Sequence, residues 1–345
     1  MCDREQLETN MDSVDETPAR RSDPEPKRKR RALLIVGIML ALLLLAGGSI
    51  GAYYASTANR AMRDINREDL MPTENRPEAT VGKDAPVNIL IAGTDSRDGT
   101  VSGRSDVMIL AHISGDRKHV YLISLPRDMW VEIPGRGMAK INAGFAYGGM
   151  PLAVQTVENL TGTYINHAAV IDFQSFIAAV DAVGGVDVYN EHAAGNFPQG
   201  NLHLNGEQAL AFTRERYGLP NGDLDRAKRQ RDVIMAVAKK VITPEVIADP
   251  AQFSRVLSVM TPYFTVNQEF TPAEMTKLAT SMRITSGEGI RSLQAPLSGF
   301  GTSPDGQSID LIHEEYFADL VAALQNDDME SYYQARKDDP PIVRR

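Results

Sequence analysis

Acidic and basic side chains gather where the sequence predicts strands to begin and end. Asp95 closely follows the first predicted strand, residues 87–93, while Arg104 and Asp106 stand at the start of the second, residues 106–113. In open α/β sheets, ligands bind where strand ends and loops converge. Two neighbouring carboxylates repel each other unless a cation lies between them, and Mg²⁺ prefers such oxygen ligands. Asp95 and Asp106 are therefore a candidate site for Mg²⁺, or for Mn²⁺.

Most of the other candidates are arginines, again near the ends of predicted elements. A lysine, an aspartate and a glutamine join them, and the set is Arg127, Asp128, Lys140, Arg214, Arg216, Arg226 and Gln230. Arginine presents a planar fork of donors that matches the oxygens of a phosphate group. A metal ion, a carboxylate pair and several arginines would together suit a pyrophosphate or a phosphoryl-transfer site. Taken singly, Asp106 and each of these arginines, Arg104 included, are better explained by a turn or a surface ion pair.

Other charged and metal-binding residue types give weaker signals. Arg229 and Arg231 are predicted to lie on a solvated helix face, and the six histidines are scattered without metal-ligand spacing. Cys2 is the single cysteine, which excludes a disulfide framework, a Cys-x-x-Cys redox pair and a cysteine-ligated zinc site. The 345 residues carry a net charge of −9, which argues against a nucleic-acid partner because such proteins need a basic surface.

The N-terminal part is typical of a membrane anchor. Residues 32–54 carry no charge, and a helix of that length spans about 30 Å of hydrocarbon. The basic block at residues 27–31 predicts that the disordered arm 1–31 is cytoplasmic and that the folded part lies outside the cell membrane. The alternatives are a cleaved signal peptide and a nucleic-acid-binding role for the basic block. Residues 55–86 are polar and are predicted to be a linker.

A layered α/β domain is predicted over residues 87–243. Strands are expected at 87–93, 106–113, 119–125, 165–173 and 186–189, and helices at 151–160, 174–183, 205–212 and 225–242. This alternation, with a hairpin between the second and third strands, predicts an α/β/α fold with a mixed central sheet and helices on both faces. Asn205 and Gln208 resemble a capping box, Gly184 and Gly185 a C-cap, and Asp225 an N-cap.

The C-terminal third is predicted to be helical and to pack on the same core. Over residues 244–326, helices are expected near 250–260, 272–282 and 314–326. Residues 327–345 are polar and contain prolines, so they are predicted to form a frayed tail.

Five phrases of the sequence, in unbroken order, resemble the LytR-CpsA-Psr family of cell-envelope proteins. They are NILIAGTDSR (88–97), GRSDVMIL (103–110), LISLPRDMWVEIPGRGMAKINAGFAYGGMPLAVQTVENLTG (122–162), VIDFQSFIAAVDAVGGVDV (170–188) and LNGEQALAFTRERYGLPNGDLDRAKRQRDVI (204–234). The resemblance covers about residues 87–240 behind a single membrane anchor. It implies an extracytoplasmic phosphotransferase with an α/β/α fold. Such an enzyme moves a glycopolymer from a polyprenyl-pyrophosphate carrier to peptidoglycan.

The same resemblance assigns roles to individual residues. It implies that Asp95 and Asp106 are the metal ligands, and that the catalytic residues are Arg104, Asp106, Arg127, Asp128 and Arg226. It implies that the pyrophosphate is bound by Arg104, Arg127, Lys140, Arg214, Arg216, Arg226 and Gln230. The chain departs from some relatives at Val131, where they carry a further arginine.

Two other functions stay open at this point. The protein could hold isoprenoid pyrophosphates at the membrane without turnover, or it could be a transcriptional attenuator. The last of these needs the arginines to be cytoplasmic, contrary to the predicted topology.

Overall fold

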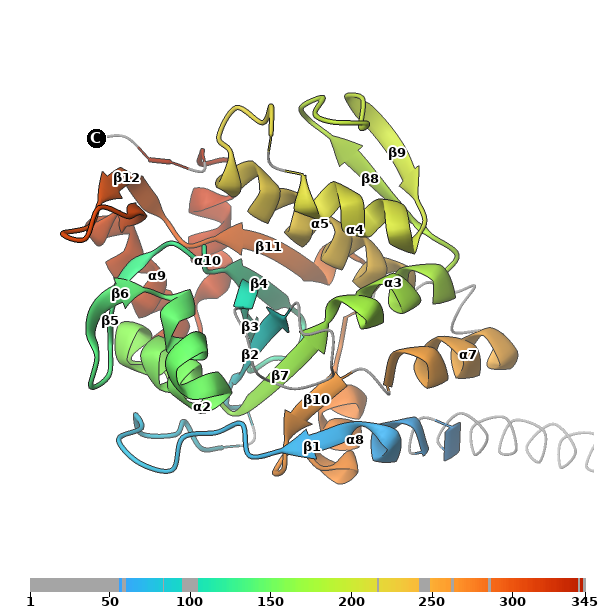
Figure 1. Cartoon of the computed structure of the whole chain (residues 1–345). Helices are drawn as coiled ribbons and strands as arrows, with labels where there is room; N and C mark the ends of the chain where they lie inside the picture. The colour runs from blue at the N-terminus through green and yellow to red at the C-terminus, as the bar shows by residue number, and fades with distance from the viewer. Residues whose placement is uncertain are drawn as a thin grey trace, which may run out of the picture. The chain divides into compact units, whose positions relative to one another are not determined.

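A seven-stranded mixed sheet runs through the middle of the fold (Figure 1). Its strands, in spatial order, are β1 (Asn66–Glu68), β10 (Phe264–Asn267), β7 (His167–Asp172), β2 (Val87–Thr94), β3 (Ser105–Ile113), β4 (Val120–Ser124) and β11 (Ile290–Gln294). β2 pairs parallel with β7, and β4 with β11, whereas β3 runs antiparallel to both of its neighbours. The predicted mixed sheet is therefore confirmed, together with the hairpin that joins β3 to β4.

The computed structural model describes residues 56–57, 60–82, 84–94, 105–215, 217–241, 249–261, 264–284, 287–340 and 342–343. The predicted arm 1–31 and the predicted membrane span 32–54 lie outside these ranges. Within them, no helix combines the length and the apolar character needed to cross a bilayer.

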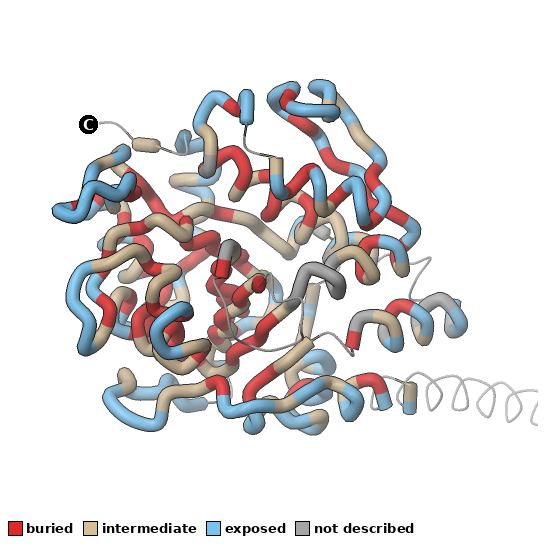
Figure 2. The backbone as a smooth tube through the Cα atoms, in the orientation of Figure 1, coloured by how far each residue is buried: buried red, intermediate tan, exposed pale blue. Residues whose placement is uncertain are grey.

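Helices cover both faces of the sheet. On one face, Leu110 and Ile123 pack in a buried cluster with residues of α2 (Asn142–Thr161), α9 (Glu314–Gln325) and α10 (Met329–Arg336). Successive residues of a strand point to opposite faces, so Ile109 and Leu122 pack on the other side, with α5 (Asp223–Val241). Figure 2 shows the buried residues gathered along the central strands and the inner sides of these helices. The predicted α/β/α layering is confirmed.

Shorter elements surround this frame. Helices α3 (Phe173–Ala182), α4 (Gly206–Arg214) and α7 (Pro250–Met260) share a second buried cluster with the hairpin of β8 (Val186–Asn190) and β9 (Gly200–Leu204). The remaining elements are the hairpins β5–β6 (Trp130–Ile133 and Gly137–Lys140) and β12–β13 (Leu297–Thr302 and Ser308–Ile312), helix α8 (Pro272–Ser281) and the single turn η2 (Gly287–Gly289).

Local signals set several element boundaries as the sequence predicts. The Asn205 side chain accepts a hydrogen bond from the backbone N–H of Gln208 at 2.9 Å, and the Gln208 side chain accepts one from the N–H of Asn205 at 3.0 Å. This capping box starts α4. Gly184 and Gly185 both have positive φ, 77° and 84°, and end the turn after α3. The predicted N-cap at Asp225 is wrong, because α5 already begins at Asp223.

The region after residue 243 contributes strands as well as helices. The predicted helices appear as α7, α8 and α9, but β10 and β11 also join the central sheet, β11 as its edge strand. These strands have only four and five residues, too few for a clear alternating pattern. Pairing with β7 and β4, which pack in the centre of the fold, holds them in place.

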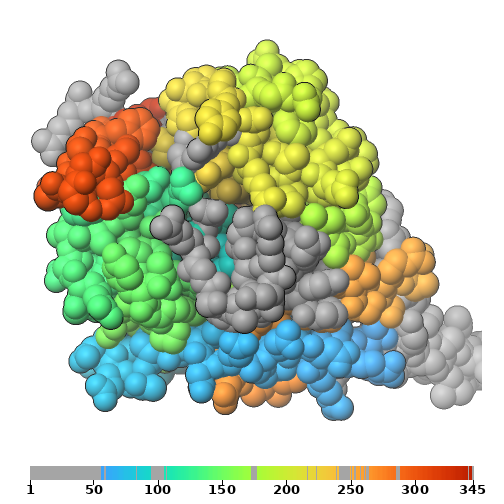
Figure 3. Space-filling model, viewed as in Figure 1, coloured from blue at the N-terminus to red at the C-terminus, as the bar shows by residue number. Residues whose placement is uncertain are grey.

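The predicted linker 55–86 is wrong over much of its length, because it contributes to the fold. β1 pairs with β10, and Leu70 is only 2% exposed. Arg76 makes a two-pronged ion pair with Glu158 of α2, whose side chain is fully buried. Figure 3 shows this N-terminal segment, in blue, lying along one side of the molecule beneath α2. A polar segment can therefore be part of the folded domain when one of its charged side chains forms an ion pair with a buried residue.

The predicted frayed tail is also wrong, because α10 docks on the sheet. Met329 and Tyr332 are buried, and Glu330 accepts hydrogen bonds from Arg291 of β11 and from the Tyr121 hydroxyl, the latter at 2.6 Å. The hydrogen bond from Arg291 outweighs partial burial and lowers the pKa of Glu330 to about 2 from its ordinary value of 4.5.

This shift predicts an acid-sensitive attachment of α10. A carboxylate whose pKa is lower in the folded state than in the unfolded state stabilises the fold at pH values above its unfolded-state pKa. For Glu330 this stabilisation is lost as the pH falls from about 5 to about 2. We expect Glu330→Gln to lower the midpoint of thermal unfolding by about 2 °C near neutral pH and to match the wild type near pH 2. Calorimetry across this range tests it, with Glu78→Gln, an exposed site, as the control. Parallel pH profiles for Glu330→Gln and the wild type would contradict this account.

Candidate functional site

Four strands end at one edge of the sheet, and the antiparallel strand β3 begins there. The residues at this edge are Thr94, Ser105, Ser124, Asp172 and Gln294, the terminal residues of β2, β3, β4, β7 and β11. Thr94 pairs with both Ser105 and Asp172, and Ser124 pairs with Gln294. The strand ends therefore converge as the sequence predicts, and we call this side of the sheet the carboxyl edge.

The predicted metal ligands adjoin this edge but cannot be assigned contacts. Asp95, Arg104 and Arg216 lie outside the described residues, and so does the side chain of Asp106, whose backbone belongs to β3. In the sequence, Asp95 follows Thr94 and Asp106 follows Ser105, the two residues that pair across β2 and β3. Over the part of the chain that the structure describes, no group of three or more His, Cys, Asp or Glu residues could hold a metal ion. The metal site stays a prediction.

Three of the predicted residues come together after β4. Lys140 Nζ lies 2.8 Å from Asp128 Oδ1, and Arg127 Nε lies 3.5 Å from Asp128 Oδ2. The β5–β6 hairpin places Lys140 there, and the backbone carbonyl of Arg127 accepts a hydrogen bond from Asn142 at the start of α2. All three side chains are about one-fifth exposed, at 19 to 23%. The Asp128 carboxylate thus holds two cations at the carboxyl edge.

The start of α5 lies at the same edge. Arg231 donates to Gln294 at the end of β11, whereas Met235, one turn later, packs with Ile290 at the start of β11. The helix therefore runs antiparallel to β11, with its N-terminus over the carboxyl edge. A helix N-terminus carries partial positive charge and attracts anions.

The predicted site residues of α5 are buried, whereas the described one of α4 is exposed. Arg226 and Gln230 are each 8% exposed, and Gln230 Nε2 donates to the carbonyl of Thr213 in α4 at 3.4 Å. Arg214, at the end of α4, is exposed. The structure thus buries the predicted pair of α5, joins Gln230 to α4, and leaves Arg214 at the surface.

The predicted solvated face at Arg229 and Arg231 is wrong. Arg229 is 4% exposed, its guanidinium lies 4.3 Å from the centre of the Phe212 ring, and Nη2 donates to Asn190 and to the His192 carbonyl, both at 2.8 Å. The alternating charges of this helix turn are typical of an exposed face, but the β8–β9 hairpin covers the Arg229 side of the helix. Sequence periodicity alone does not reveal that cover.

Arg231 is the residue near the site that the sequence prediction missed. It is 9% exposed, and its contact with Gln294 Oε1 is 3.3 Å long. Within the described ranges, no carboxylate lies at ion-pair distance from its guanidinium. Desolvation by burial lowers the pKa of Arg231 to about 10, so the side chain stays charged near neutral pH. A buried cation without a counter-charge is costly unless an anion binds to it.

A comparison with protein families shows the family of the chain. The model of the LytR_cpsA_psr family matches residues 50–326. The chain belongs to this family. The resemblance predicted from the five sequence phrases is confirmed.

Relatives of this LytR_cpsA_psr protein support the same assignment. It is 37% identical over 226 residues to a protein of Bacillus cereus named polyisoprenyl-teichoic acid–peptidoglycan teichoic acid transferase TagU, covering 63% of this chain and 73% of that protein. A protein of the same name from Enterococcus faecalis is 32% identical, over 87% of this chain and 98% of its own length. The crystal structure of B. subtilis TagV matches with a TM-score of 0.60 and 25% identity, over 72% of this chain and 99% of that chain.

The contacts of Arg229 predict a structural role. Arg229→Ala would leave the Asn190 oxygen and the His192 carbonyl without this donor and would expose part of the Phe212 ring. We expect the free energy of unfolding to fall by about 2–3 kcal/mol, measured by urea denaturation. The matched control is Lys239→Ala, an exposed lysine on the same helix. A loss below about 0.5 kcal/mol, typical of surface substitutions, would contradict this role.

Proposed function

We propose that this protein is a phosphotransferase that moves a glycopolymer from a polyprenyl-pyrophosphate carrier to peptidoglycan, leaving a phosphodiester link. The observation that carries the proposal is the convergence of Arg127, Lys140 and the N-terminus of α5, with its buried arginines, at one edge of the sheet. The name of the TagU relatives, polyisoprenyl-teichoic acid–peptidoglycan teichoic acid transferase, supports the choice of donor and acceptor. A teichoic acid is therefore the glycopolymer that we propose.

In the proposed reaction, the protein mainly neutralises negative charge on the phosphate oxygens and forms no covalent intermediate. A hydroxyl of the acceptor attacks the phosphorus nearer the sugar and gives up its proton to the solvent. A new O–P bond forms and the bond to the bridging oxygen breaks, so that polyprenyl phosphate leaves. Phosphoryl transfer spreads negative charge over the non-bridging oxygens, which cationic donors stabilise. In our proposal Arg127, Lys140 and Arg226 supply these donors, with Arg104, Arg214, Arg216 and Gln230 as further contacts. Asp128 holds Arg127 and Lys140 in place.

We further propose that Asp95 and Asp106 bind Mg²⁺, or Mn²⁺, beside the pyrophosphate. Their sequence positions next to the paired residues Thr94 and Ser105 support this choice, and carboxylate oxygens are the ligands that such ions prefer. When bound, the ion would supply Lewis-acid stabilisation of the phosphate charge.

We propose that residues 32–54 anchor the protein in the cell membrane with the folded part outside. The lipid carrier is confined to the membrane, so a tether raises the local concentration of enzyme near its donor. The uncharged run and the basic block before it support this topology.

Removing a phosphate contact tests the proposed activity. With full-length protein, a lipid-linked glycopolymer, peptidoglycan and Mg²⁺, we expect the wild type to release polyprenyl phosphate and to label peptidoglycan. Arg127→Ala is expected to lower this rate about a hundredfold or more, the usual effect of losing a charge-stabilising donor. Asp106→Ala and metal chelation are expected to have a similar effect.

The matched control is Arg136→Ala, an exposed arginine between β5 and β6. It is expected to keep wild-type activity. Tight binding of the lipid pyrophosphate without any turnover would reject the transferase and favour a binding protein. Full activity of both Arg127→Ala and Asp106→Ala would reject the site.

A further inference from the structure

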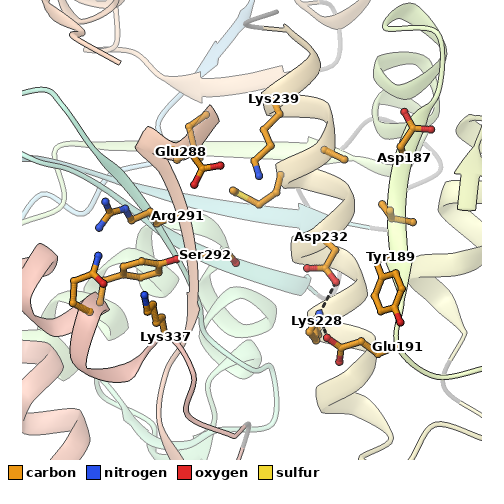
Figure 4. A pocket seen from close by; sticks show the side chains of 16 residues that line it. Asp187, Tyr189, Glu191, Lys228, Asp232, Lys239, Glu288, Arg291, Ser292 and Lys337 are labelled. Atoms are coloured by element: carbon orange, nitrogen blue, oxygen red, sulfur yellow. Dashed lines mark hydrogen bonds and ion pairs between the residues drawn. The ribbon is translucent and has the colours of Figure 1, made fainter. Parts of the chain in front are cut away.

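A polar trough follows the edge strand β11 on the side that faces α5. Two adjoining cavities of about 540 and 490 Å³ share the lining residues Glu191, Lys228, Asp232, Ser292 and Lys337, and we call this continuous space the β11 trough. Figure 4 shows one wall formed by α5 and β8 and the other by β11 and the segment after α10. The trough therefore runs beside the whole of β11.

The inner end of the β11 trough lies at the carboxyl edge. Gln294 and Arg231 both line this end, and Gln294 pairs with Ser124, three residues before Arg127 in the sequence. Arg231 is 9% exposed and lacks a carboxylate at ion-pair distance within the described part of the chain. A guanidinium held in this way can donate hydrogen bonds to an anionic group that enters along the trough.

The charges along the trough are balanced rather than basic. Its outer half is lined by four cations, Lys228, Lys239, Arg291 and Lys337, and by an equal number of carboxylates, among them Glu191 and Asp232. Lys228 is held between those two carboxylates, at 3.1 and 2.9 Å. A polyanion would meet repulsion at every carboxylate, which costs affinity. A hydroxyl-rich chain with isolated groups of both signs would find partners on both walls.

Two of the cations are available to such a chain. Lys239 on α5 and Lys337 after α10 are both exposed, come from opposite walls (Figure 4), and make no ion pair in the residues that the structure describes. Tyr189 exposes 56% of its surface on the same rim and offers an apolar ring face beside a hydroxyl.

We propose, on the basis of the transferase activity proposed above, that the β11 trough binds the acceptor. The acceptor is a peptidoglycan strand, whose sugars carry hydroxyls and whose short peptides carry both carboxylates and amines. Arg231 receives a carboxylate at the inner end, and Lys239 and Lys337 contact carboxylates further out. The strand then presents its hydroxyl at the carboxyl edge, where Arg127 and Lys140 lie.

Binding of soluble peptidoglycan fragments to the full-length protein tests the trough directly. By isothermal titration calorimetry, we expect the double variant Lys239→Glu with Lys337→Glu to bind the fragments about tenfold more weakly, because it replaces attraction by repulsion. The matched control is Lys277→Glu on α8, whose side chain is 78% exposed, and it is expected to bind as the wild type does. No binding by the wild type, or equal binding by the double variant, would overturn the proposal.

Arg231→Met separates anion binding from a structural role. Within the described residues this buried cation has no carboxylate partner, so its replacement by an apolar side chain of similar length is expected to leave the midpoint of thermal unfolding unchanged or higher. We expect the same variant to weaken fragment binding about tenfold. A lower midpoint with unchanged binding would overturn the role given to Arg231.

The kinetics of transfer show whether the trough binds the peptidoglycan acceptor or the lipid-linked donor. They also separate the proposal about the trough from the proposed transferase function. The double variant is expected to raise KM for peptidoglycan about tenfold while leaving KM for the lipid-linked donor unchanged. A rise confined to the donor KM would assign the trough to the glycopolymer and overturn the proposal. If the wild type binds the fragments but transfers nothing, the proposed transferase function fails while the trough remains a peptidoglycan site.

Discussion

The register of the central sheet is the constraint on which the rest of the site depends. Because Thr94 pairs with both Ser105 and Asp172, and Ser124 pairs with Gln294, strands that are far apart in the sequence end beside one another at the same edge. A shift of one residue would turn each strand's side chains to the opposite face of the sheet. The two buried clusters on the two faces prevent such a shift, since each takes alternate residues of β3 and β4. Apolar packing thus fixes the position of the cations that follow β4.

Burial then decides what those cations can do. The protein carries a net charge of −9, yet α5 buries Arg226, Arg229 and Arg231 within two turns. The local potential at a site depends on the nearest charges and the dielectric around them rather than on the sum over the surface. Arg229 is held by Asn190, His192 and Phe212 and serves the packing of the β8–β9 hairpin. Arg231 donates to the side-chain amide of Gln294 and lines a cavity.

Sequence patterns predicted the elements that carry strong local signals. The capping box at Asn205, the glycines after α3 and the apolar strands β2 to β4 all carry their signal in neighbouring residues of the sequence. The elements that were missed depend on distant partners. β1, β10 and β11 are short and acquire stability by pairing, Arg76 is ordered by the buried Glu158, and α10 is fixed by Arg291. The convergence at the carboxyl edge was predictable from strand order. The burial of Arg229 and Arg231 was not, because the residues that cover them belong to other elements, and the spacing of residues within one helix does not show what packs on it.

The pairing of distant strands has a consequence for how the protein is made. Asn66 of β1 pairs with Thr265 of β10, and Val120 of β4 pairs with Ile290 of β11, so the sheet joins early and late parts of the chain. Such non-local contacts slow folding. A chain that emerges from the ribosome N-terminus first leaves the outer edge of β4 open until the residues of β11 have been synthesised. An open strand edge invites pairing with other chains, so the nascent protein is most vulnerable to aggregation just before its last elements appear.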